Sequence, residues 1–182
     1  MMDREISYPP FVRKMVQAYA LFGGVLLILA ALVTVISVGT RAVGLEVISG
    51  DFELIELATG IAVFSFLPWG HMTGAHVRVD VLAARFGPRV FRVLGGISDG
   101  LVALIATVIL WRFYLGFAEK FPYGSEVFRS VFSMGSKPFY PETTYELQIQ
   151  IWLPFGFCLI GAGLFALVAI LKFTADIKGT KP

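Results

Sequence analysis

The sequence is poor in charged residues, cysteine and histidine, and each shortage excludes a class of protein or site. Only 15% of its 182 residues are charged, whereas 57% are hydrophobic and the mean hydropathy is +0.77. A soluble domain of ordinary composition carries about 25% charged residues. The composition therefore excludes an ordinary soluble domain and indicates a membrane protein.

The single cysteine, Cys158, excludes an intrachain disulfide and a dithiol redox mechanism. The two histidines, His71 and His76, lie together in the stretch GHMTGAHVRVDVLA. A haem site would need axial histidines inside the spans, and zinc about four ligands, whereas this stretch offers His71, His76 and Asp80. Nothing nearby indicates a nucleophile for acid/base catalysis. We expect polar residues at a helix end in the headgroup region, with no catalytic residue, metal or cofactor.

Four apolar segments are long enough to cross a bilayer, which takes about 20 residues in a helix. Segments 15–40 and 147–171 contain no charged residue and no histidine. The first is longer than the core of a signal peptide, about 7–15 residues, so we expect it to be retained. We predict an all-α membrane protein with a single domain over residues 1–182. The predicted spans are about 15–40, 52–70, 93–118 and 147–172, with an outer loop over 119–146.

Basic residues gather in the two tails and between the second and third predicted spans. Ten of the fifteen lie there: Arg4, Arg13, Lys14, Arg78, Arg85, Arg89, Arg92, Lys172, Lys178 and Lys181. The loop between the first two spans instead sets Arg41 against Glu46, Asp51, Glu53 and Glu56. The positive-inside rule therefore predicts that both termini are cytoplasmic. Trp111 and Tyr114 near the outer end of span three are typical of the membrane interface.

The segment after the second span, VRVDVLAARF over residues 77–86, predicts a short interfacial amphipathic helix on the cytoplasmic side. Val79, Ala83 and Phe86 share one face, and Gly87-Pro88 separates this helix from the third span. Four arginines lie at this headgroup depth: Arg78, Arg85, Arg89 and Arg92. They either set the topology alone or also bind anionic lipids, at about 1 kcal/mol for each basic residue.

Asp99 and Arg112 fall inside the third predicted span, where an ionisable group is a functional candidate. Their separation along a helix is about 20 Å, so they cannot pair with each other. We expect Asp99 near the inner interface, hydrated or bonded to a cytoplasmic arginine. Arg112 either snorkels outward or meets an acidic group or lipid at a partner interface.

The element GAHVRVDVL, placed between the second and third of four spans, resembles a motif of the small membrane subunit of TRAP transporters, the DctQ/SiaQ family. The residues that carry the resemblance are Gly74, His76, Val79, Asp80 and Leu82. The acidic pair Glu53 and Glu56 in DFELIEL, and the Pro-Phe-Gly turn at 154–156, are also similar to the family.

This resemblance implies a non-catalytic scaffold subunit of a sodium-driven importer of organic acids, either carboxylates or sialic-acid-like compounds, in the bacterial inner membrane. The expected partners are a large many-span permease subunit, a periplasmic substrate-binding protein and anionic membrane lipids, but no nucleic acid. The large subunit would move as an elevator and hold the substrate site, so none is expected here. The alternative is a stand-alone four-helix anchor of a redox enzyme complex or a small homo-oligomeric channel.

Overall fold

The computed structural model describes residues 8–45, 49–74 and 87–177, with the backbone alone for 87–92. In these residues the chain forms α1 (Pro10–Ala42), α2 (Asp51–Met72), α4 (Gly87–Lys120), α5 (Glu126–Val131) and α6 (Trp152–Ile177). The described part contains one isolated β-bridge, between Thr143 and Gln150, and no strand. The predicted interfacial helix over 77–86 lies outside the described residues.

Four of these helices are long and apolar enough to cross a membrane: α1, α2, the part of α4 from Val93 to Lys120, and α6. They confirm the predicted all-α membrane fold. Pro9 and Pro10 lie at the start of α1, where the first N–H groups have no acceptor within the helix, so the missing N–H of proline costs no hydrogen bond. Gly50 precedes α2 with φ +79, a left-handed conformation that favours glycine.

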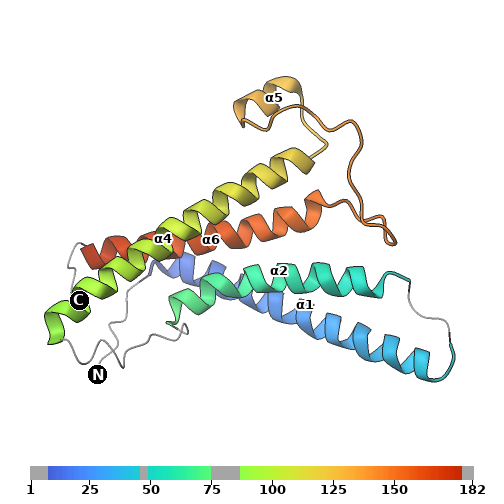
Figure 1. Cartoon of the computed structure of the whole chain (residues 1–182), viewed down its shortest axis with the longest axis horizontal. Coiled ribbons are helices and arrows are strands. Elements are labelled where there is room, and N and C mark those ends of the chain that lie inside the picture. Colours follow the sequence, from blue (N-terminus) through green and yellow to red (C-terminus); the bar gives the residue numbers. More distant parts are fainter. Residues whose placement is uncertain (1–7, 46–48, 75–86, 178–182) are drawn as a thin grey trace.

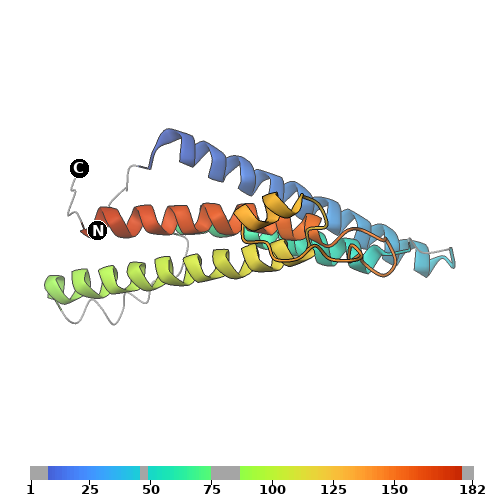
Figure 2. The same cartoon turned by 90° about the horizontal axis from the view of Figure 1, so that it is seen from above.

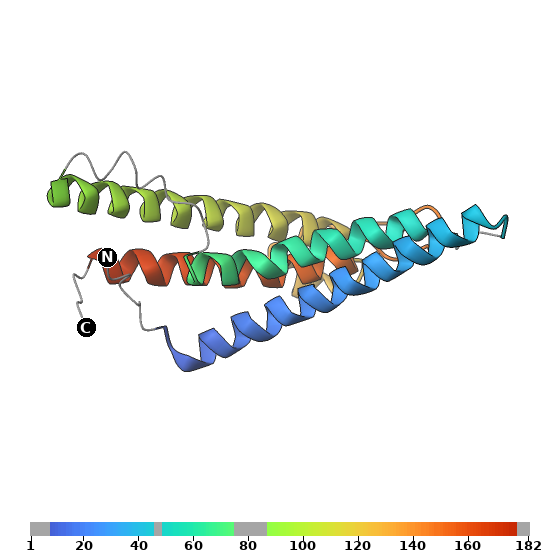
Figure 3. The ribbon, with the colours of Figure 1, turned by 90° about the horizontal axis from the view of Figure 1, so that it is seen from below.

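The helices pack in the spatial order α1, α2, α6, α4, as Figure 1 shows. We call the end where α1 and α4 finish and α2 and α6 begin the α5 end of the bundle. Figures 2 and 3 show the same bundle from above and below. The first half of α1 contacts α6, where Tyr19 donates to the carbonyl of Phe157, whereas toward the α5 end α2 lies between the two helices (Figure 1). The apolar window of α6 is 44% buried, against 17% for each of the other three, so α6 is the central helix.

Two hydrophobic clusters contact α6 from different sides. One joins α1 to α6 and contains Val12, Val16, Leu164 and Val168. The other joins α4 to α6 and contains Ala103, Ala106, Phe165, Ala166 and Ala169. The small alanines let the α4 and α6 backbones approach closely, which is the usual way that helices pack inside a bilayer.

The contact between α2 and α6 depends on a proline and a glycine. Pro68 has no N–H and therefore donates no helical hydrogen bond to the carbonyl of Phe64. Gly161 of α6 packs directly on that carbonyl, because a Cβ atom at Gly161 would lie 2.4 Å from the Phe64 oxygen. On the other side of α2, a Cβ atom at Gly23 of α1 would lie 2.6 Å from Ser65 Cβ. Both neighbours of α2 thus need glycine at the contact.

The last helix begins at Trp152 rather than at 147, and continues to Ile177 rather than to 172. Residues 143–150 form a turn closed by the Thr143–Gln150 bridge, in which Gln148 has φ +53. Ile151 N then donates to Glu142 O at 3.0 Å, so the chain before Trp152 is bonded across the turn and not along a helix. Because α6 continues to Ile177, Lys172 lies inside the helix, although it was counted with the C-terminal tail from the sequence.

Candidate functional site: polar contacts that join the helices

The family-like motif falls mostly outside the described residues. Its first residue, Gly74, follows α2 with φ +69, a conformation that favours glycine. The others, His76, Val79, Asp80 and Leu82, lie outside the described residues, as do Arg78 and Arg85. The side chains of Arg89 and Arg92, in the first turns of α4, are also not described. Lipid contact by these arginines and the role of the motif therefore stay predictions.

His71 lies in the last turn of α2, and its side chain is buried. Its ring meets Phe165 of α6 edge to face, with 5.6 Å between the ring centroids. Ala62, Ser65, Pro68 and His71 are buried residues spaced by three, so they wind round α2. Ser65 therefore meets Gly23 of α1, whereas His71 meets α6. His71 therefore packs α2 against α6.

Asp99 and Lys172 form an ion pair between α4 and α6, with 3.1 Å between Asp99 Oδ1 and Lys172 Nζ. The two side chains are only 8% and 10% exposed. Tyr8, just before α1, lies close enough that Asp99 contributes to raising the pKa of its hydroxyl to about 12, with burial as the larger cause and Asp176 as a further one. Water or an arginine was expected beside Asp99, whereas the partner is Lys172, which was counted among the basic residues of the C-terminal tail.

Asp51 joins α1 to α2 at the α5 end of the bundle. Its Oδ2 accepts a hydrogen bond from the hydroxyl of Ser37 and another from Arg41 Nη2, at 3.1 Å. Its Oδ1 accepts from Phe52 N at 2.9 Å. From the sequence, Arg41 and Asp51 were expected only as loop charges, because nothing in their spacing shows that α1 and α2 bring them together.

Glu53 ties the long connection before α6 to the first turn of α2. Its carboxylate accepts from the backbone N–H groups of Glu146, at 2.7 Å, and Leu147, at 3.0 Å. Leu147 also packs on Gly50, where a Cβ atom would lie 2.5 Å from Leu147 Cγ. Of the acidic pair that resembles the family, Glu53 therefore has a contact within this chain, whereas Glu56 is exposed.

Arg129 is 3% exposed and was not among the site residues expected from the sequence. Its guanidinium donates to six backbone carbonyls at 2.7–3.2 Å, those of Ala118, Phe121, Tyr123, Met134, Gly135 and Ser136. Two of these carbonyls lie at the end of α4, where helical N–H partners run out and the helix dipole is negative. Arg129 thus caps α4 and fixes α5 to it. The only signal in the sequence was a lone arginine in the apolar stretch SEVFRSVF.

Arg112 is exposed on α4, next to Trp111, which is 58% exposed. Both expectations for it, snorkelling or contact with a partner, therefore stay predictions.

Lys120 Nζ lies 2.5 Å from Glu142 Oε2 and holds the connection after α5 to the end of α4. Across residues 8–45, 49–74 and 87–177, no three His, Cys, Asp or Glu side chains gather as metal ligands.

Over residues 30–179 the sequence matches the family described as tripartite ATP-independent periplasmic transporters, DctQ component. The chain belongs to the DctQ family. It is therefore a small membrane component of a TRAP transporter, and DctQ components work with the large TRAP permease and a substrate-binding protein. No curated protein and no solved structure matched the chain.

Proposed function

We propose that this DctQ component is the scaffold that braces the large permease subunit of a sodium-driven importer of organic acids, carboxylates or sialic-acid-like compounds. The permease subunit would bind substrate and sodium and move as an elevator, and the periplasmic protein would deliver the substrate. In this proposal the chain lies in the bacterial inner membrane with both termini cytoplasmic, and it has no catalytic group of its own.

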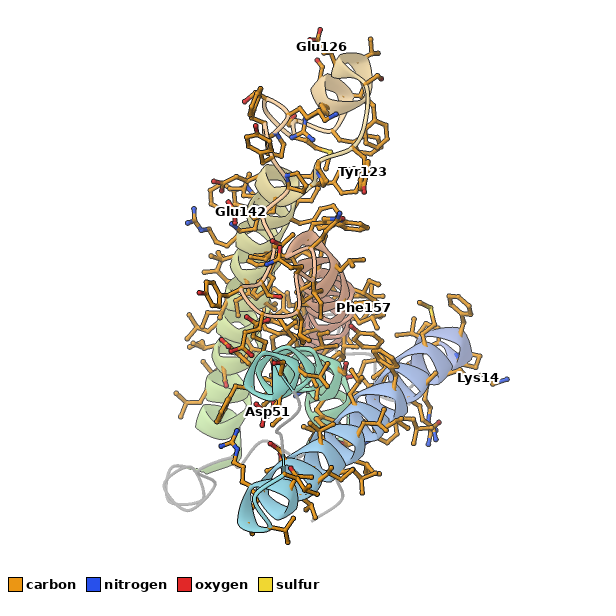
Figure 4. The ribbon with its side chains drawn as sticks, turned by 90° about the vertical axis from the view of Figure 1, so that its right-hand side faces the viewer. Lys14, Asp51, Tyr123, Glu126, Glu142 and Phe157 are labelled. Carbon is orange, nitrogen blue, oxygen red and sulfur yellow. The ribbon has the colours of Figure 1, made fainter. Side chains whose placement is uncertain are left out.

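The observation that carries the bracing role is that the chain's buried polar side chains bond to its own elements. Asp51 joins α1 to α2, Lys172 joins α6 to α4, and Arg129 joins α5 to α4. Glu53 adds a fourth contact, between α2 and the connection before α6. Figure 4 shows Asp51, and Glu142 that pairs with Lys120, at separate places at the α5 end of the bundle. Such contacts favour a rigid body over one that rearranges around a substrate.

The test is sodium-driven uptake in proteoliposomes that contain the large permease subunit, with the binding protein outside and with or without this chain. The probes are radiolabelled succinate and N-acetylneuraminate. We expect uptake of one of them only with an inward sodium gradient, and at least ten-fold less when this chain is left out. Uptake that is unchanged without the chain would contradict bracing, and uptake that ignores the gradient would contradict sodium coupling.

A matched pair of variants separates bracing from mere presence in the complex. Asp51→Ala removes the contacts to Ser37 and Arg41, so α1 and α2 lose their polar connection at the α5 end, and uptake should fall while the subunits still co-purify. Glu119→Gln changes an exposed carboxylate of α4 and should leave uptake unchanged. If both variants transport like the unmodified complex, rigidity of this chain is not needed for transport.

A further inference from the structure

Helix α5 has its polarity reversed relative to a helix on the surface of a soluble protein. Val127 and Val131 are 74% and 72% exposed, whereas Arg129 on the opposite side of the same helix is 3% exposed. Phe128 and Phe132 are also exposed, and their rings pack together with 4.7 Å between centroids. We call Val127, Phe128, Val131 and Phe132 the α5 apolar face. Glu126, the first residue of α5, is exposed too, but it lies about 100° from Val127 on the side away from these apolar residues. One side of α5 therefore exposes apolar residues without a charge, which fits apolar surroundings.

The depth of α5 is fixed by its contacts with α4. The hydroxyl of Tyr114 donates to the carbonyl of Phe132, and Arg129 Nη2 donates to Ala118 O at 3.0 Å. Tyr114 lies six residues before the end of α4 at Lys120, which is about 9 Å along a helix. The chain therefore turns back after α4, and α5 lies beside the last turns of the membrane-spanning helix. Trp111 and Tyr114 are aromatic residues of the kind that lie at the membrane interface.

The position of α5 in the molecule agrees with this depth. Figures 1 and 4 show α5 to the side of the bundle, next to the end of α4 and away from α1, rather than stacked over the helix ends. On the adjoining part of α4, Trp111 and Leu115 are exposed as well. The α5 apolar face therefore continues the exposed apolar surface of α4 sideways.

From these observations we propose that α5 is an interfacial anchor whose apolar face lies in the bilayer leaflet at the α5 end of the bundle. The contact with Tyr114 holds α5 beside the part of α4 that carries interfacial aromatic residues, so lipid is the apolar surroundings expected at this depth. Interfacial helices of this kind insert an apolar face roughly 5–10 Å into the boundary between headgroups and acyl chains. Arg129 directs its donors to backbone carbonyls and so leaves the inserted face without a charge.

The test uses single cysteines in a Cys158→Ser background, because Cys158 is the only cysteine of the chain. The full chain, one copy per nanodisc of phosphatidylcholine and phosphatidylglycerol, is labelled with bimane at Val131→Cys. The controls are Ser130→Cys, which lies about 100° round the same helix, and Tyr145→Cys, 89% exposed in the same connection. Quenching is measured with iodide in the water and with nitroxide lipids labelled near the headgroup.

We expect bimane at position 131 to be quenched by the nitroxide lipids at least three-fold more than at positions 130 and 145, and by iodide at least three-fold less. Iodide quenching at 131 equal to that at 145 would overturn the proposal. So would shielding from iodide without quenching by the lipids, because a protein surface would then cover the face. Val127→Cys, 74% exposed, gives a second test of the same face if Val131→Cys does not fold.

Discussion

Buried ionisable side chains of this DctQ component act through the partners that a second helix brings to them. Asp99 and Lys172 are 73 positions apart in the sequence by their numbers, yet their charged atoms lie 3.1 Å from each other. Both side chains are buried, and a buried charge that loses its partner costs about 3–5 kcal/mol, so each of the two compensates the other. The pair therefore specifies how α4 and α6 are aligned along their length.

At this residue scale we predict that Asp99→Asn and Lys172→Met each destabilise the chain, by about 3–5 kcal/mol, because each leaves an uncompensated buried charge or a broken pair. The double variant should be less destabilised than the sum of the two, since it leaves no buried charge. The measurement is thermal unfolding of the purified chain in detergent. Glu119→Gln, an exposed carboxylate of α4, is the control and should leave the midpoint unchanged. Additive losses in the double variant would mean that the two side chains do not depend on each other.

At the scale of the elements, the contacts of α2 depend on how closely the backbones of α1 and α6 approach it, and less on hydrophobic side chains. Gly161 of α6 lies against the Phe64 carbonyl that Pro68 leaves without a helical donor, and Gly23 of α1 lies against Ser65. Larger residues at either glycine would push α2 away from its neighbours. The same element carries His71 at its end, packed on Phe165.

We therefore expect Gly161→Ala to lower the unfolding midpoint, although alanine at an open position inside a helix usually stabilises by about 0.5–1 kcal/mol. The reason is that the new Cβ atom would lie 2.4 Å from a backbone oxygen, which cannot move without shifting α2. Gly163→Ala on the same helix is the matched control, because its nearest neighbour is Leu110 Cδ1 at 3.8 Å. It should leave the midpoint unchanged or raise it. Equal effects of the two variants would show that α2 and α6 do not need this close contact.

At the scale of the whole molecule, the positions of the arginines relative to the ends of the four helices are expected to set the orientation in the membrane. The segment between α2 and α4 and the start of α4 contain Arg78, Arg85, Arg89 and Arg92. The positive-inside rule weighs basic residues close to span ends, so these four should contribute more than lysines in the last residues of the tail.

The corresponding prediction compares two sets of substitutions. Replacing Arg85, Arg89 and Arg92 with Gln should produce a fraction of inverted chains or weaken assembly with the large subunit, because the charge bias across the membrane falls. Replacing Lys178 and Lys181 with Gln should have a smaller effect. The measurement is the accessibility of a C-terminal reporter on each side of the membrane, together with co-purification of the permease. Equal and negligible effects of the two sets would contradict the prediction that these arginines set the orientation or support assembly.

The amino-acid sequence by itself determined that the chain is an all-α membrane protein with four spans and that it resembles the DctQ family. Length and uniform hydropathy decide both the helix and its placement in lipid, because a spanning segment must satisfy every backbone hydrogen bond internally. Tertiary structure alone decided that α6 is central, that Lys172 meets Asp99, and that Arg129 caps α4. Those contacts join residues far apart in the sequence, or residues brought together by a turn, and hydropathy along one segment contains no information about which side chain of another segment will face it.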